Sequence, residues 1–117
     1  MHTGQIAVEY TGEICVIVLK GEHDLSTAPD LRVHVEDAVI AGGDLIVDLT
    51  EVGFIDSSIL GVLVAGYRSV TAAARRFAVV AVPQSSVTRL FDLVSMSDVI
   101  PVYPTRAEAL STLGRAS

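Results

Sequence analysis

The amino-acid sequence predicts an α/β domain in which a mixed sheet of four to five strands packs with about four helices. Short apolar runs alternate along the chain with longer segments whose apolar residues recur at helical spacing. Residues 57–74 are helical in character and lie between two apolar runs that are typical of strands. A connection of that length is too long for a hairpin, so it joins parallel strands by a crossover. At 117 residues the chain fits one domain, which we expect to span residues 1–117.

The first third of the chain predicts two strands and a helix. Apolar residues alternate over residues 6–10, and a Thr-Gly-Glu turn leads into the apolar run 14–19, which indicates a tightly joined strand pair. The helix that follows is indicated by Thr27 and Pro29, residue types that favour the start of a helix. Two glycines at 42–43 end this segment, because glycine adopts the left-handed conformation that terminates helices.

The rest of the chain predicts further strands and helices around the helix at 57–74. Residues 45–49 and 76–82 are nearly continuous apolar runs, as is typical of strands buried on both faces of a sheet. The remaining expected elements are an amphipathic helix within 85–96, a short edge strand at 99–102 and a last helix that opens on a capping box of Thr105 and Glu108.

The composition favours a protein partner over nucleic acid or membrane. The formal net charge is −6 and the chain has only eight lysines and arginines, whereas phosphate backbones attract clustered basic residues. No apolar stretch approaches the ~20 residues needed to span a bilayer, and the N-terminus lacks the basic and apolar blocks of a targeting segment. We therefore expect a cytoplasmic protein with no membrane contact. Its one cysteine, Cys15, lies in an apolar run where an inert buried thiol is expected.

The stretch Asp56-Ser57-Ser58 stands between an expected strand and the apolar helix that follows it. Aspartate and serine are favoured helix N-caps, because a side-chain oxygen accepts a bond from a backbone N–H group that has no partner within the helix. One cap needs one residue, so the stretch holds more polar side chains than capping explains. Functional loops collect at the carboxyl ends of strands in open α/β sheets, which makes this stretch a candidate site.

The helix after this stretch has apolar residues in nearly every direction around its axis. A helix at the surface of a lone domain should show a polar face. Either neighbouring helices cover this helix, or its outer face binds a partner. Gly61 and Gly66 are both consistent with close approach by another backbone.

A serine hydrolase is the natural enzymatic alternative, with Ser57 as the nucleophile and His23 or His34 as the base. The G-x-S-x-G turn that exposes a hydrolase nucleophile is absent around Ser57. His34 is expected on the solvated face of the first helix, which leaves His23, expected in a loop beside Asp24, as the candidate base. A response-regulator receiver would need a lysine after a late strand, and the only lysine is Lys20. We therefore expect a binding module that is not an enzyme and holds no metal.

Three separate segments resemble signature blocks of the STAS domain family, in particular bacterial anti-sigma factor antagonists. They are GEHDLSTA (21–28), LIVDLTEVGFIDSSILGVL (45–63) and SSVTRLFDLVSMSDVI (85–100). The blocks keep the family's order and rough spacing, so the resemblance covers essentially the whole chain and implies the strand-first α/β fold expected above. Two other roles remain open within this resemblance, a component of a signalling assembly and the soluble subunit of a lipid-transport complex.

The resemblance implies a phosphorylation-controlled partner switch. In this family the serine after the aspartate of the Asp-Ser-Ser block, here Ser57, is phosphorylated by a cognate anti-sigma factor that is also a serine kinase. The unphosphorylated antagonist binds that anti-sigma factor and frees a sigma factor, whereas the phosphorylated form does not bind; a phosphatase acting on phosphoserine is the second partner implied. The position of Asp24 lies close to the phosphorylated serine and to the kinase surface. No cofactor is expected, because ATP and Mg²⁺ belong to the kinase.

The sequence departs from the family pattern directly after the two serines, where the family usually has glycine and this chain has Ile59. We expect Ile59 to help form the binding surface and to restrict the choice of partner. The expected partner-binding residues are therefore Asp24, Asp56, Ser57, Ser58 and Ile59.

Overall fold

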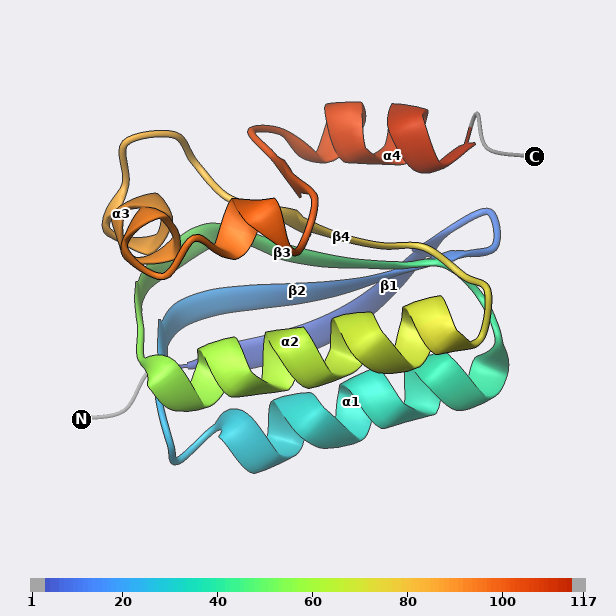
Figure 1. Ribbon diagram of the computed structural model, residues 1–117. Coiled ribbons are helices and arrows are strands. Elements are labelled where there is room, and N and C mark those ends of the chain that lie inside the picture. The colour runs from blue at the N-terminus through green and yellow to red at the C-terminus, as the bar shows by residue number, and fades with distance from the viewer. Residues whose placement is uncertain (1–3, 115–117) are drawn as a thin grey trace.

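A five-stranded mixed sheet forms the centre of the computed structural model, which describes residues 4–114 (Figure 1). The strands lie in the order β1-β2-β3-β4-β5. They are β1 (Gln5–Thr11), β2 (Ile14–His23), β3 (Leu45–Ile55), β4 (Phe77–Val80) and β5 (Val102–Tyr103). β1 runs antiparallel to β2, and each of the other neighbouring pairs is parallel. The mixed α/β sheet predicted from the sequence is confirmed.

Helices cover both faces of this sheet (Figure 1). They are α1 (Ala28–Ala41), α2 (Ser57–Ala72), α3 (Ser86–Leu93), the 3-10 turn η1 (Met96–Asp98) and α4 (Arg106–Gly114). Buried residues of α1, α2 and α3 share one apolar cluster with one face of the sheet, whereas those of α4 pack against the other face. The three central strands lie between these layers and are buried on both sides, which is why their sequences are almost continuous apolar runs.

The ends of α1 and the first hairpin follow the predicted signals. Thr27 is the N-cap residue of α1, and a proline stands in the first turn. Gly42 ends the helix in the left-handed conformation, with φ of 86°, and its N–H group donates to backbone carbonyls of the last turn. The turn between β1 and β2 contains Gly12 at φ of 60°, a conformation that glycine adopts without strain.

The central strands differ in length from the prediction. β3 continues to Ile55 instead of ending near residue 49, because it pairs with β2 as far as His23 across two register irregularities. Tertiary pairing therefore overrides the weak strand propensity of the polar residues and glycine in this part of β3. β4 is shorter than the run 76–82, since its ladder with β3 covers only Phe77–Val80.

The predicted edge strand at 99–102 is wrong at its start, and the preceding helix ends early. α3 stops at Leu93, and Ser95 adopts the left-handed conformation with φ of 54° before η1 begins. The backbone N–H groups of Val99 and Ile100 both donate to the carbonyl of Met96, so these residues close the 3-10 turn and do not join the sheet. The edge strand β5 begins only after them.

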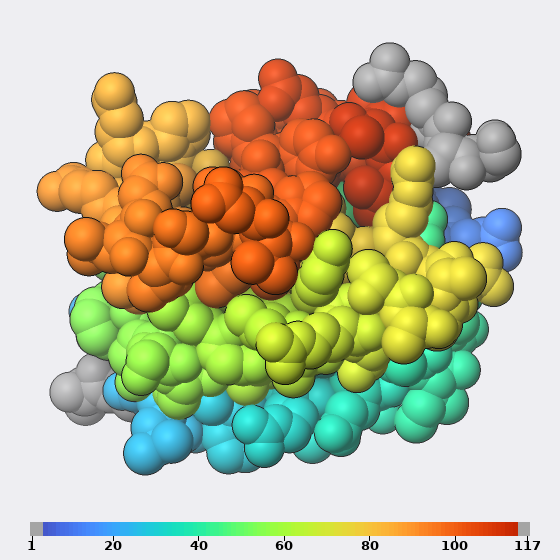
Figure 2. All heavy atoms as spheres, viewed as in Figure 1, coloured from blue at the N-terminus to red at the C-terminus, as the bar shows by residue number. Residues whose placement is uncertain are grey.

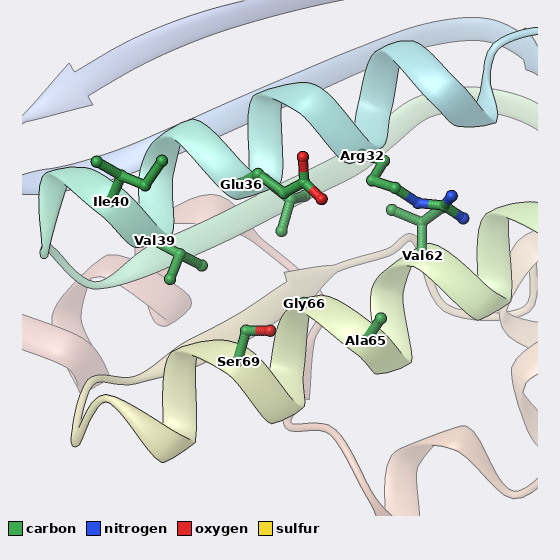
Figure 3. A pocket seen from close by; sticks show the side chains of 9 residues that line it. Arg32, Glu36, Val39, Ile40, Val62, Ala65, Gly66 and Ser69 are labelled. Carbon is green, nitrogen blue, oxygen red and sulfur yellow. The ribbon is translucent and has the colours of Figure 1, made fainter.

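α1 and α2 lie side by side on the sheet, and a groove of about 460 Å³ runs between them (Figure 3). Gly66 of α2 lies where the packing is closest, since a Cβ atom there would lie 2.8 Å from Cγ1 of Val35 and 3.3 Å from Cε2 of Phe77. The predicted close approach at Gly66 is therefore made by side chains and not by a backbone. At Gly61 no such approach is made within residues 4–114, because none of their atoms outside the helix's own backbone lies within 4 Å of such a Cβ atom.

Arg106 of α4 forms hydrogen bonds with side chains of two strands that are not neighbours in the sheet. Its Nε donates to Oδ2 of Asp48 on β3 at 2.8 Å, and its Nη1 donates to Oε1 of Glu9 on β1 at 2.8 Å. Asp48 is only 3% exposed, and its second oxygen accepts hydrogen bonds from the backbone N–H and the hydroxyl of Thr50. The buried carboxylate is therefore fully partnered, as buried charges must be.

Candidate functional site

Asp56 is the N-cap residue of α2, at the point where β3 ends. Its Oδ1 accepts hydrogen bonds from the backbone N–H groups of Ser58 at 3.0 Å and Ile59 at 3.3 Å. The Ser58 hydroxyl donates to the same oxygen at 2.5 Å. These bonds satisfy N–H groups that have no acceptor within the helix. The start of the helix therefore uses the side chains of Asp56 and Ser58.

Ser57 lies outside this hydrogen-bond network. Its side chain is exposed, and its hydroxyl makes no hydrogen bond with any residue in the range 4–114. The two neighbouring serines therefore differ in their surroundings although they are adjacent in sequence. The hydroxyl of Ser57 is presented to solvent, where an external reagent or enzyme has access to it.

The loop between β2 and α1 lies beside Asp56. The pKa of the Asp56 carboxyl is lowered, chiefly by the hydrogen bond from the Ser58 hydroxyl and against the opposing effect of partial burial. The backbone amide of Leu25, which belongs to this loop, contributes to the lowering of this pKa. Asp24, half-buried in the same loop, accepts hydrogen bonds from the backbone N–H of Ser26 at 2.9 Å and from its hydroxyl at 2.6 Å. The structure therefore brings the loop that contains Asp24 to the start of α2.

His23 is the last residue of β2 and is fully buried, so the prediction of a loop histidine is wrong. Its Nε2 lies 3.0 Å from the carbonyl oxygen of Lys20, and its Nδ1 lies 3.0 Å from the hydroxyl oxygen of Thr27. Because a carbonyl only accepts, Nε2 carries a proton. Both ring nitrogens are engaged, so His23 is not placed to activate Ser57. His34 is half-buried on α1, whereas the sequence predicted a solvated position.

Ile59 points into the core and not to the surface. Its side chain is fully buried and belongs to the cluster beneath α1, α2 and α3. The prediction that Ile59 helps form a binding surface is therefore wrong, because a partner does not reach this side chain while the first turn of α2 is intact. The next exposed positions on α2 are Gly61 and Ala65.

The exposed face of α2 that continues from Ser57 toward the C-terminus of the helix carries small residues. Ser57, Gly61 and Ala65 are four residues apart and therefore lie on one face of the helix. A groove of about 550 Å³ runs beside this face, where the segment after α3 (orange) packs against α2 (yellow-green) in Figure 2. Its apolar lining includes Leu60, Val64, Val94, Met96 and Val99. Neighbouring elements thus cover one side of α2 and leave an accessible apolar strip on the other.

Two large apolar side chains near this site were missed by sequence reasoning. Leu25 is 72% exposed in the loop beside Asp56, and Phe54 is 49% exposed near the end of β3. Exposed apolar side chains close to a candidate site favour a contact surface there. The available signal was a leucine between Asp24 and Ser26, in a polar loop where folding does not require an apolar residue.

Removal of the Asp56 carboxylate should lower stability in a pH-dependent way. We expect Asp56→Ala to cost about 0.5–2 kcal/mol of unfolding free energy at neutral pH, because α2 loses its N-cap. Asp56→Asn is the matched control, since asparagine caps helices equally well but does not ionise. The measurement is urea unfolding of both variants and the wild type at several pH values.

The direction of this pH dependence follows from the lowered pKa of Asp56. A carboxyl whose pKa is lower in the folded state stabilises the fold above its unfolded pKa, and this contribution disappears as the pH falls through the folded pKa. The advantage of wild type over Asp56→Asn should therefore shrink below the ordinary value of 3.8. An advantage that grows with acidity would contradict this account of the cap.

Other reactive groups offer no second site in the part of the chain that the structure describes. Cys15 is 5% exposed, and burial raises the pKa of its thiol, as expected for an inert cysteine. Within residues 4–114 no group of three His, Cys, Asp or Glu side chains is placed to hold a metal ion. The same range contains no helix with the length and apolar character required to cross a membrane.

The sequence and the structure of this chain are similar to those of known proteins. The family model of the STAS domain matches residues 5–109. An anti-sigma F factor antagonist of Paenibacillus polymyxa is 28% identical to this chain, over 93% of this chain and 94% of that protein. The crystal structure of an anti-sigma factor antagonist from Mycobacterium paratuberculosis is 29% identical and superposes with a TM-score of 0.87, covering 96% of this chain and 95% of that one.

A third similar protein is known in a modified state. The Bacillus cell fate determinant SpoIIAA, solved in its phosphorylated form, is 25% identical to this chain, with a TM-score of 0.71 over 92% of this chain and 98% of that one. The family match extends from β1 into α4 and thus includes every strand and the start of α2. This chain belongs to the STAS domain family.

Proposed function

We propose that the protein is an anti-sigma factor antagonist whose binding is controlled by phosphorylation of Ser57. The observation that carries this proposal is the difference between the two serines at the start of α2. Ser58 donates to Asp56 and holds the helix end, whereas the exposed Ser57 hydroxyl has no hydrogen bond within the described residues. The antagonist names of the similar proteins and the phosphorylated structure of one of them support the same role.

In this proposal the partner is an anti-sigma factor with serine kinase activity. It binds the unphosphorylated protein and thereby releases a sigma factor. The kinase supplies ATP and Mg²⁺, and a separate phosphatase restores the serine. Binding takes place in the cytoplasm, on the surface formed by Asp24, Asp56, Ser57 and Ser58 and continued by the small residues of α2.

The exposed surroundings of Ser57 support a switch that leaves the fold intact. A phosphate adds about −1.5 to −2 charges. At the solvated start of a helix this charge is tolerated, because the helix dipole favours anions there. At a dehydrated interface an unpaired ion costs several kcal/mol, and the neighbouring carboxylates of Asp24 and Asp56 add repulsion. Phosphorylation is therefore expected to separate the complex and not to unfold the domain.

The test combines site-resolved mass spectrometry with binding measurements. Incubation with the cognate kinase and ATP should place phosphate on Ser57 only. Ser57→Asp should melt like wild type but bind the anti-sigma factor at least about tenfold more weakly, a difference of about 1.4 kcal/mol or more. Ser57→Ala should bind and resist modification. Isothermal titration calorimetry and melting curves measure the two properties separately.

Ser58→Ala is the matched control for this experiment. It removes a hydroxyl that donates to the capping carboxylate of Asp56, so it should lower the melting temperature while phosphorylation of Ser57 continues. Phosphate found on Ser58 or Thr50 alone would reject Ser57 as the acceptor. Equal affinities of wild type and Ser57→Asp would place Ser57 outside the interface.

A further inference from the structure

The two edges of the sheet differ in how they are protected against pairing with another chain. The β5 edge has only two residues, Val102 and Tyr103, and prolines stand on either side of them at 101 and 104. Short edge strands and prolines are devices that prevent edge-to-edge association. The opposite edge, β1, has seven residues and pairs with β2 without a register shift, and its sequence QIAVEYT contains no proline and no lysine.

The β1 edge also exposes apolar side chains. Val8 is 40% exposed and Tyr10 is 64% exposed. Both face the side of the sheet that α1 and α2 cover, because their β2 partners Ile17 and Cys15 belong to the core on that side. Val33 of α1 is 54% exposed and lines a small pocket together with Ile6 of β1. The apolar layer therefore ends at β1 without cover among the described residues.

We propose that β1 pairs with β1 of a second copy of this chain, so that two sheets join into one across a two-fold axis at Val8. An antiparallel pair centred on the middle residue of the strand uses all seven residues of each copy. Val8 then lies opposite the partner's Val8, and Ile6 lies opposite the partner's Tyr10. Both pairs lie on the apolar side of the sheet, where β-branched and aromatic residues pair favourably across strands.

The charges of β1 are compatible with this self-pairing. Glu9 is the only charged residue of the strand, and it lies on the opposite face of the sheet, where Arg106 binds its carboxylate at 2.8 Å. In the proposed register Glu9 faces the partner's Ala7, so like charges do not meet. Ser57 follows β3, which is separated from β1 by β2 in the strand order, and β1 itself contributes no residue to the proposed phosphorylation site. The dimer is therefore proposed as a contact distinct from the switch at Ser57.

The proposal predicts a concentration-dependent dimer that a charge at the centre of β1 disrupts. Sedimentation velocity of the wild type should show association at protein concentrations up to about 1 mM. A dimer with a dissociation constant above this concentration is too weak to support the proposal. Val8→Lys and Val8→Glu should each weaken association at least tenfold, because two like charges then face each other. An equimolar mixture of the two variants should associate again as a mixed dimer. Val99→Lys is the matched control and should associate like wild type, because Val99 is a 50% exposed valine between η1 and β5, the strand at the opposite edge of the sheet from β1.

Hydrogen exchange provides a second readout that needs no substitution. Backbone amides of β1 that point away from β2 should gain protection as the protein concentration rises. A wild-type chain that stays monomeric to about 1 mM, a Val8→Lys variant that associates unchanged, or a mixture that fails to associate would each overturn the proposal. Loss of association in Val99→Lys would overturn it as well.

Discussion

Methionine in place of Arg106 should lower the free energy of unfolding by about 3 kcal/mol. The substitution removes the donor to Oδ2 of Asp48. Water does not replace this donor readily, because Asp48 is only 3% exposed. Removing one partner of a buried ion pair costs about 3–5 kcal/mol, because the remaining charge is neither solvated nor neutralised. The lower end of that range applies here, since Thr50 still donates to the other oxygen. Urea unfolding at neutral pH measures the effect.

Two further variants separate the buried charge from the loss of packing. Arg106→Met combined with Asp48→Asn removes both charges, and it should recover part of the lost stability. Glu9→Gln removes only the exposed end of the network, and we expect a loss below about 1 kcal/mol, as for other exposed ion pairs. A loss of similar size for Glu9→Gln and Arg106→Met would show that Asp48 does not depend on Arg106.

Alanine in place of Ile59 should lower the free energy of unfolding by about 2–5 kcal/mol. The side chain is fully buried between α2 and the sheet, so truncation leaves a cavity that the surrounding residues fill only in part. Ile59→Val removes a single methylene group and should cost about 0.5–1.5 kcal/mol. Thermal and urea unfolding should rank the three proteins, from most to least stable, as wild type, Ile59→Val and Ile59→Ala.

Ile59→Val also decides between a role in the core and a role in partner choice. If Ile59 acts only in the core, this folded variant should bind the anti-sigma factor and accept phosphate on Ser57 as wild type does. A changed affinity with unchanged stability would restore the hypothesis of a specificity residue. Binding is compared at a temperature where both proteins are fully folded.

Much of the fold was predictable because local signals and tertiary packing agree. Thr27, Pro29 and Gly42 mark the two ends of α1 in the sequence, and the structure has the helix between them. The length of β3 was not predictable, because its last part pairs with β2 in spite of Gly53 and several polar residues. Strand pairing between distant segments decides such a case, and no local pattern reports it.

The candidate site was predictable in position but not in detail. Asp56, Ser57 and Ser58 were found from their place between a strand and a helix. Which of the three side chains caps the helix, and which serine donates to that cap, depends on side-chain directions that composition does not encode. The burial of Ile59 was hidden for a different reason: α2 is apolar in nearly every direction, so periodicity did not show which side faces the sheet. Arg106 and Asp48 are 58 positions apart, and nothing in either segment points to the other.

The bond between Arg106 and Asp48 has a consequence for synthesis on the ribosome. The ribosome adds Asp48 to the chain 58 residues before Arg106. At a synthesis rate of about 5–20 residues per second, this corresponds to a delay of about 3–12 s. During this interval the chain grows from within β3 to the start of α4, and the sheet face under α4, including Val18 and Ile46, lacks the cover that this helix provides. The apolar residues of this sheet face are therefore accessible to chaperones and to neighbouring nascent chains until α4 has left the exit tunnel.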